Sequence, residues 1–164
     1  MPATIGTIDA NGLRFATLEW GKTGPLVVCF HGFPDTAYTW DVLGPALAEA
    51  GYRVVAPFLR GYAPTALPST DTDSRTLGQD VLGILAALTD GPVRVVGHDW
   101  GAEAVYAAMG LDASRIARAA TIAIPHRAAV PFTPSLVWAL RHFATLRLPG
   151  AERRFADALI PFLR

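Results

Sequence analysis

Short apolar runs that alternate with helix-like segments constrain the fold of this chain more than any other feature. Four such runs have the continuous apolar character of strands buried on both faces of a sheet, at residues 25–32, 52–58, 93–97 and 115–125. Between them, residues 39–51 and 74–91 repeat apolar side chains at helical spacing, and each of these segments closes at a glycine. The alternation predicts right-handed strand–helix–strand units, and therefore an α/β fold with a three-layer, mostly parallel sheet.

The two ends of the chain differ from this alternating pattern. The stretch TIGTIDANGLRFATLEWG alternates around an Asn-Gly pair, which is a strong signal for a two-stranded antiparallel hairpin. After Pro125 the periodicity is helical only, and prolines interrupt it repeatedly. We therefore expect residues 1–125 to form a sheet domain and residues 126–164 to form a helical addition outside the sheet.

Composition limits the possible partners. Hydrophobic residues make up 51% of the chain and charged residues 17%, which indicates a packed globular protein. The formal net charge is 0, which excludes a global attraction to nucleic acid or anionic lipid, but residues 115–164 carry 8 arginines against 2 acidic residues. Such a basic segment can contact a membrane or nucleic acid. We favour arginines on the solvated faces of amphipathic helices, and predict neither partner.

Cysteine and histidine usage exclude further classes. The single cysteine, Cys29, lies in an apolar run and cannot form an internal disulfide framework. No apolar stretch reaches the length of a membrane span, and the first residues lack the regions of a signal peptide, so we expect a cytoplasmic protein. No histidine pair has the helical spacing of metal ligands, and neither a metal nor a cofactor is predicted.

The stretch VGHDWGA places Asp99 between Gly97 and Gly101, directly after a predicted buried strand. Flanking glycines are typical of the sharp strand-to-helix turn that presents a nucleophile above a sheet. A carboxylate is already an anion at neutral pH. It therefore needs no activating base and suits displacement at a saturated carbon, such as that of an epoxide or alkyl halide, which leaves an alkyl-enzyme ester. The alternative is that Asp99 only caps the following helix.

The stretch HGFPDTAYTW, residues 31–40, follows another apolar run. A His-Gly turn at this place in the chain can supply part of an oxyanion hole, although an ordinary Gly-Pro turn has the same composition. The two turns lie about 65 residues apart, and each follows an apolar strand. Their combination favours a catalytic site over a helix cap.

Together, HGFPDTAYTW, VVAPFLRGYAPT and VGHDWGA resemble the α/β-hydrolase superfamily, and within it the epoxide-hydrolase-like branch. The resemblance covers essentially the whole chain. It implies that Asp99 is the nucleophile and that the backbone N–H groups of Phe33 and Trp100 form the oxyanion hole. It also implies a cis peptide bond between Phe33 and Pro34.

The resemblance assigns further roles around these two turns. His31 is expected to orient its turn and not to act as the base, and the side chain of His98 is expected to point away from substrate. The residues expected to bind substrate are His31, Pro34, Asp35, Trp100 and His142.

The family pattern also includes parts that these 164 residues do not show. Its acid and histidine lie beyond a helical cap, on loops after a seventh and an eighth strand, whereas only His126 and His142 follow Asp99. Its proton-donating cap tyrosines are missing, since all four tyrosines fall in the sheet domain and His142 stands near the expected place. We therefore expect residues 126–164 to be the beginning of a cap in the N-terminal part of a longer enzyme. The sheet would stop before its last strands, and the chain would lack the acid and histidine that turnover needs.

Two other functions stay open. A haloalkane dehalogenase-like hydrolase would share Asp99 and Trp100, although Phe33 stands where that family has a second halide ligand. A non-catalytic α/β-hydrolase-like binding module would also fit the missing histidine, whereas a serine esterase is excluded because no Ser or Cys occupies the turn. The predicted substrate is a small apolar electrophile, an epoxide or a halide. Self-association is a further expectation, because residues 119–124 would form an exposed apolar edge.

Overall fold

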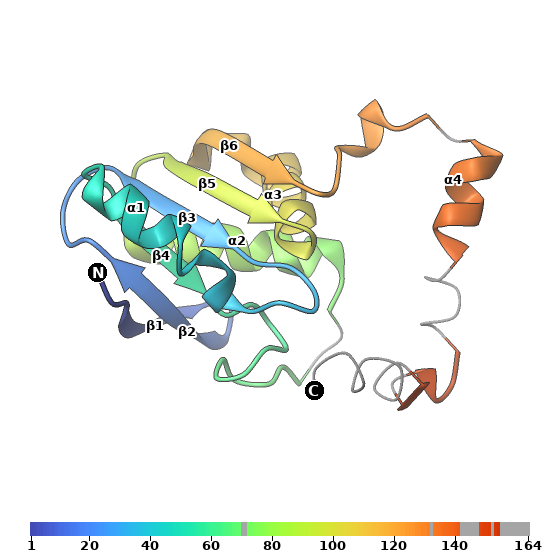
Figure 1. Cartoon of the computed structure of the whole chain (residues 1–164), viewed down its shortest axis with the longest axis horizontal. Helices are drawn as coiled ribbons and strands as arrows, with labels where there is room; N and C mark the ends of the chain where they lie inside the picture. Colours follow the sequence, from blue (N-terminus) through green and yellow to red (C-terminus); the bar gives the residue numbers. More distant parts are fainter. Residues whose placement is uncertain (70–71, 132, 142–147, 152, 155–164) are drawn as a thin grey trace. The chain divides into compact units, whose positions relative to one another are not determined.

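Six strands form one mixed sheet in the computed structural model, which describes residues 1–69, 72–131, 133–141, 148–151 and 153–154. In chain order the strands are β1 (Thr4–Ala10), β2 (Leu13–Trp20), β3 (Leu26–Phe30), β4 (Arg53–Pro57), β5 (Val93–His98) and β6 (Ile116–Ile122). They lie in the order β1-β2-β4-β3-β5-β6 (Figure 1). The pairs β1–β2 and β2–β4 are antiparallel, and the other three are parallel. The predicted mostly parallel sheet is confirmed.

The contacts divide the chain into two units, Met1–His126 and Arg127–Arg164. The first unit contains the sheet and the helices α1 (Leu43–Glu49), α2 (Ser74–Leu88) and α3 (Trp100–Asp112). α1 covers one face of the sheet, and α2 and α3 cover the opposite face (Figure 1). The predicted three layers are therefore present.

Each face of the sheet packs on its own hydrophobic core. Val28 and Phe30 of β3 belong to the core beside α2 and α3, whereas Val27 and Cys29 belong to the core beside α1. All four side chains are buried, because alternate residues of a strand face opposite sides of the sheet. A strand covered on both faces needs apolar residues at every position, which explains the continuous apolar runs.

The N-terminal hairpin is confirmed. Asn11 and Gly12 join β1 to β2 with φ angles of 45° and 72°, as a two-residue hairpin turn requires.

Both predicted helices are shorter than their apolar periodicity suggests. The segment 39–51 splits into a 3-10 turn, Ala37–Trp40, and α1, because Pro45 has no N–H to donate and is tolerated only in a first helical turn. Gly51 ends α1 with φ 88°, as predicted for a glycine cap. The segment 74–91 ends as a helix at Leu88.

An arginine takes the place of the glycine cap that was expected at Gly91. The guanidinium of Arg115 donates hydrogen bonds to the carbonyl oxygens of Thr89 and Asp90, just beyond the end of α2. Cationic side chains stabilise helix C-termini in this way.

The pairing of β5 with its two neighbours brings the predicted site turns together. Gly97 lies opposite Phe30 of β3, and His98 lies opposite Ile122 of β6. Parallel strands end at the same edge of a sheet, so the turns after β3 and β5 leave it side by side.

β6 is the last strand of the sheet within the described residues. Residues 117–120 are exposed, and so is Ile122, whose exposed fraction is 49%. The apolar surface of this strand is therefore largely uncovered by the part of the chain that the structure describes.

The second unit is described only in part. Its helix α4 (Pro134–Ala139) begins with Pro134 in the first turn, and the hydroxyl of Thr133 accepts the N–H of Leu136 at 3.2 Å. His142 lies outside the described residues. No helix among the described residues is long and apolar enough to cross a membrane. The assignment of this unit as the start of a cap stays a prediction.

Candidate active site

Asp99 occupies a strained turn between β5 and α3. Its φ and ψ angles are 52° and −117°, a region that residues with a side chain rarely populate. The N–H of Asp99 donates to the carbonyl of Ile122 at 3.1 Å, and its carbonyl accepts the N–H groups of Ala102 and Glu103 at 2.9 and 3.2 Å. The neighbouring strand and the first turn of α3 therefore hold the backbone in this conformation.

Three glycines make room for this turn. A Cβ atom at Gly97 would lie 2.6 Å from the carbonyl oxygen of Gly101, and a Cβ atom at Gly101 would overlap the carbonyl of Phe30. A Cβ atom at Gly32 would overlap the Cβ of Asp99 and would lie 2.8 Å from its Oδ1. The glycine spacing in the sequence is therefore a packing requirement of this turn.

The carboxylate of Asp99 faces the turn after β3. Its Oδ1 accepts the backbone N–H of Phe33 at 2.9 Å, and its side chain makes no capping hydrogen bond to α3. Asp99 therefore occupies the N-cap position of α3 without capping the helix through its side chain. No described residue hydrogen-bonds to the second oxygen, Oδ2, which is left available to an incoming group.

The predicted oxyanion donors are the backbone N–H groups of Phe33 and Trp100. Phe33 already donates to the Asp99 carboxylate, and Trp100 is the first residue of α3, where a backbone N–H has no acceptor within its own helix. The peptide bond between Phe33 and Pro34 is cis, as predicted. The side chains of Phe33 and Trp100 are 42% and 40% exposed, and Pro34 and Asp35 are exposed as well.

His31 connects the turn after β3 to the segment that follows β4. Its ring is fully buried, its Nδ1 lies 3.0 Å from the carbonyl oxygen of Gly32, and its Nε2 accepts the N–H of Leu59 at 3.0 Å. This pattern places the proton of a neutral ring on Nδ1. Burial lowers the pKa of His31, which also favours the neutral form. Both nitrogens are occupied by backbone partners, and a direct contact of His31 with substrate stays a prediction.

Tyr62 is a neighbour of the site for which the sequence predicted no role. Its ring meets the ring of His31 edge-on, with 4.6 Å between centroids. Burial, together with the negative charges of Asp99 and Asp35, raises the pKa of Tyr62 to about 12. The only signal in the sequence was its loop, RGYAPT, which follows a parallel strand and therefore leaves the sheet at the same edge as the two turns.

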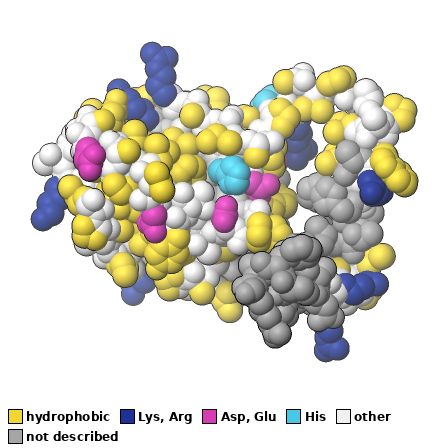
Figure 2. Space-filling model, viewed as in Figure 1, with side chains coloured by type: hydrophobic (Ala, Val, Ile, Leu, Met, Phe, Trp, Pro, Cys, Tyr) yellow, Lys and Arg dark blue, Asp and Glu magenta, His cyan; other side chains and the backbone are white. Residues whose placement is uncertain are grey.

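The remaining histidines have other surroundings. The Nδ1 of His98 is buried without a described partner. His126 packs edge-on against Tyr106 at 5.0 Å between centroids, and the hydroxyl of Tyr106 lies 2.7 Å from Thr121 Oγ1. No group of His, Cys, Asp and Glu side chains among the described residues is placed to hold a metal ion. Figure 2 shows acidic side chains and a histidine close together within a largely hydrophobic area of the surface.

Comparisons with known proteins identify the family of the fold. A family model described as alpha/beta hydrolase fold matches residues 25–156. Epoxide hydrolase A of Mycobacterium tuberculosis is 42% identical over 131 residues, which are 77% of this chain and 41% of that protein. Epoxide hydrolase 3 of Siraitia grosvenorii is 35% identical over 160 residues, which are 92% of this chain and 50% of that protein.

A solved structure shares the fold over the same region. The crystal structure of an epoxide hydrolase from Vigna radiata superposes with a TM-score of 0.82 at 28% identity, and the match covers 96% of this chain and 54% of that one. The chain spans about half the length of these relatives.

Proposed function

The chain belongs to the alpha/beta hydrolase fold family, and from that premise we propose that it is epoxide hydrolase-like, with Asp99 as its nucleophile. The observation that carries the proposal is the 2.9 Å hydrogen bond from the N–H of Phe33 to Asp99 Oδ1. It gives the two carboxylate oxygens different roles. Oδ1 is held by an oxyanion donor, while Oδ2 is available to attack.

In the first step, Oδ2 attacks a carbon of the epoxide. The new bond joins this oxygen to the carbon, the epoxide C–O bond breaks, and the released alkoxide takes a proton from solvent water to become a hydroxyl. The product is an ester of Asp99 in which Oδ1 is the carbonyl oxygen. Asp99 can act without a base because a carboxylate is already ionised at neutral pH.

In the second step, water attacks the ester carbon and negative charge develops on Oδ1. The bond between this carbon and Oδ2 then breaks, the diol leaves with a proton that the water gave up, and the Asp99 carboxylate re-forms. The N–H of Phe33 already lies at Oδ1, and the free N–H of Trp100 would supply a second donor. One such donor is typically worth about 10²- to 10³-fold in rate. This step also needs a general base. The family resemblance places that base and its acid after a seventh and an eighth strand, and we propose that residues 1–164 contain neither.

The test is covalent capture. The 164-residue chain is incubated with a small reactive epoxide and analysed by intact-mass and peptide mass spectrometry. We expect one adduct per chain, on Asp99, with no sustained release of diol. Asp99→Asn should abolish the adduct, whereas Asp41→Asn, which removes an exposed carboxylate outside the site, should not.

Two results would contradict the proposal. An adduct on another residue, or none at all, would remove Asp99 as the nucleophile. Sustained diol release by the wild-type chain would mean that these residues contain a base, with His126 and His142 as the candidates. A parallel arm with an alkyl halide separates the dehalogenase-like alternative, which predicts faster capture of the halide than of the epoxide.

A further inference from the structure

The loop after β4, residues 58–65, contacts the turn that carries the Phe33 donor. The N–H of Leu59 donates to Nε2 of His31, and Tyr62 packs edge-on against the same ring. The opposite nitrogen of His31 bonds to the carbonyl of Gly32, the residue immediately before Phe33. A single buried ring therefore contacts both this loop and the Gly32–Phe33 peptide.

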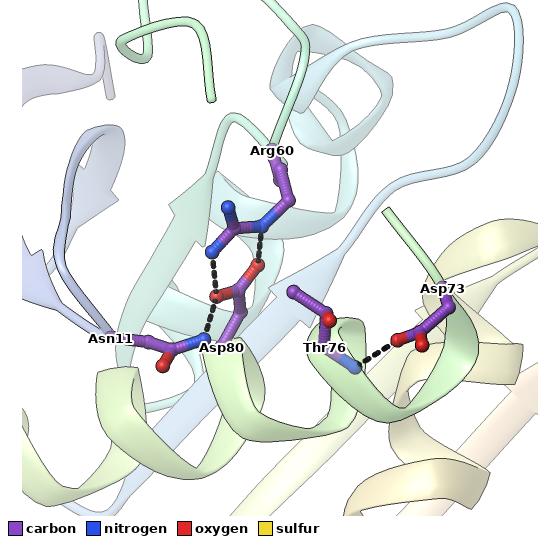
Figure 3. A network of polar contacts seen from close by, with 5 residues as sticks. All are labelled: Asn11, Arg60, Asp73, Thr76 and Asp80. Carbon is purple, nitrogen blue, oxygen red and sulfur yellow. Dashed lines mark hydrogen bonds and ion pairs between the residues drawn. The ribbon is translucent and has the colours of Figure 1, made fainter. Parts of the chain in front are cut away.

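A buried ion pair fixes the middle of this loop. Arg60 donates from Nε to Asp80 Oδ2 at 2.7 Å and from Nη2 to Asp80 Oδ1 at 2.6 Å, and Asn11 donates to Asp80 Oδ1 at 2.7 Å (Figure 3). The side chains of Arg60 and Asp80 are only 5% and 3% exposed. A bidentate guanidinium–carboxylate pair fixes direction as well as distance. The loop is thereby attached to α2 and to the β1–β2 turn.

Asp80 sits on a well-anchored part of α2. The helix begins with Asp73, whose carboxylate accepts the N–H of Thr76 at 2.7 Å (Figure 3). The ends of the loop are also attached to the sheet, since the hydroxyl of Thr65 donates to the carbonyl of Phe58 at 2.6 Å and accepts the N–H of Ala16 at 3.0 Å. Between these ends, Arg60 is the charged residue through which the loop bonds to α2.

Stability alone is a weak reason to bury such a pair. Removing two charges from water is costly, and apolar residues of similar volume are often as stable or more so. Apolar residues, however, cannot form the two parallel hydrogen bonds by which a guanidinium fixes the direction of a carboxylate. Because the loop also contacts His31, the direction in which the ion pair holds the loop bears on the position of the His31 ring.

We propose that Arg60 and Asp80 are positioning residues for the oxyanion donor. Their ion pair places the loop at residues 58–65, the loop holds the ring of His31, and the ring sets the Gly32–Phe33 peptide so that its N–H meets Asp99. The role of the Phe33 N–H as an oxyanion donor rests on the proposed function, whereas the effect of the ion pair on the position of this N–H does not.

The experiment measures the hydrogen bonding of the Phe33 N–H directly. In the 164-residue chain, NMR follows the Phe33 amide and the His31 Nδ1–H in Arg60→Lys, which keeps the charge and loses the fork, and in the double variant Arg60→Met/Asp80→Leu. The matched control is Arg14→Lys, because Arg14 forms an exposed bidentate pair with Asp9 at 2.8 and 3.1 Å near the same hairpin turn.

In both Arg60 variants the Phe33 amide hydrogen should lose the chemical shift of a hydrogen-bonded amide. It should also exchange with solvent about tenfold faster or more, because a hydrogen bond to a charged group is lost. The His31 Nδ1–H should shift as well, and Arg14→Lys should change neither signal. If Arg60→Lys does not fold, the double variant decides, because it leaves no buried charge unpaired.

A folded double variant with unchanged Phe33 and His31 signals would overturn the inference and leave the pair a stabilising role only. Asp99 alkylation is measured in parallel. A wild-type chain that is never alkylated, but whose Phe33 signal responds to Arg60→Lys, would refute the proposed function and support the positioning.

Discussion

At the scale of single residues, Asp99 combines a rare backbone conformation with surroundings that admit almost no extra atom. The strain of its φ and ψ angles is stabilised by hydrogen bonds to β6 and α3, and Gly97, Gly101 and Gly32 enclose it. Conformations of this kind persist where the surrounding structure over-determines them, and they cluster at functional sites.

This enclosure predicts opposite effects of one substitution at two places in α3. Gly101→Ala would drive a Cβ atom into the backbone carbonyls of Phe30 and His31, so we expect a loss of at least about 3 kcal/mol in the free energy of unfolding. Gly110→Ala meets no atom within 4 Å and should raise that free energy by about 0.5–1 kcal/mol, because alanine is the better helix former. Urea denaturation measures both, and equal effects would contradict the packing argument.

His31 predicts a pH dependence of stability. Burial lowers its pKa below the ordinary value of 6.5, so the unfolded chain binds more protons than the folded chain just below that pH. The free energy of unfolding should therefore fall as the pH drops through this window and level off below the folded-state pKa. Besides burial, the groups that act on its titration are the Gly32 carbonyl and the charges of Asp35 and His98.

His31→Gln removes the titration and keeps an acceptor for the N–H of Leu59. Urea denaturation between about pH 7.5 and pH 5 should show a shallower pH slope for this variant than for the wild-type chain, because other groups contribute equally to both. Identical slopes would mean that His31 keeps its ordinary pKa in the folded state.

At the scale of elements, the end of β6 carries a second unusual backbone conformation. Ala123 follows the strand with φ 73°, where a Cβ atom is unfavourable. Ala123→Gly should therefore stabilise the chain by up to about 1 kcal/mol. Ala117→Gly, within the strand, should destabilise it by about 0.5–1 kcal/mol, because glycine loses more conformational freedom on folding. Thermal unfolding of both variants tests the sign, and two changes of the same sign would contradict the assignment.

The strands and the two site turns could be predicted because their signals are local. Continuous apolar runs mark strands buried on both faces, and Gly97 and Gly101 mark the turn around Asp99. The end of α2 could not be predicted in the same way, because Arg115, far along the chain, satisfies the carbonyls beyond it. Tyr62 and the Arg60–Asp80 pair were missed for the same reason. Their roles arise from contacts between distant segments, which leave no periodic pattern.

At the scale of the whole molecule, the exposed surface of β6 predicts self-association. The strand ends the sheet among the described residues, and Ala119 and Ala120 are exposed. Uncovered apolar edges tend to pair with other chains. Light scattering of the 164-residue chain should therefore give a mass above that of a monomer, and Ala119→Lys should lower it, because charges on an edge oppose pairing. A stable wild-type monomer would contradict this expectation.

The contacts around position 99 act on the backbone more than on the side-chain group that this position carries. The carbonyl of Ile122, the first turn of α3 and the three glycines all act on the backbone or on the space around Cβ. Among the described residues, Phe33 is the one that donates a hydrogen bond to the carboxylate. Serine and cysteine have the same Cβ and would fit the same turn. The turn therefore fixes the position of residue 99 largely independently of the group that its side chain carries beyond Cβ.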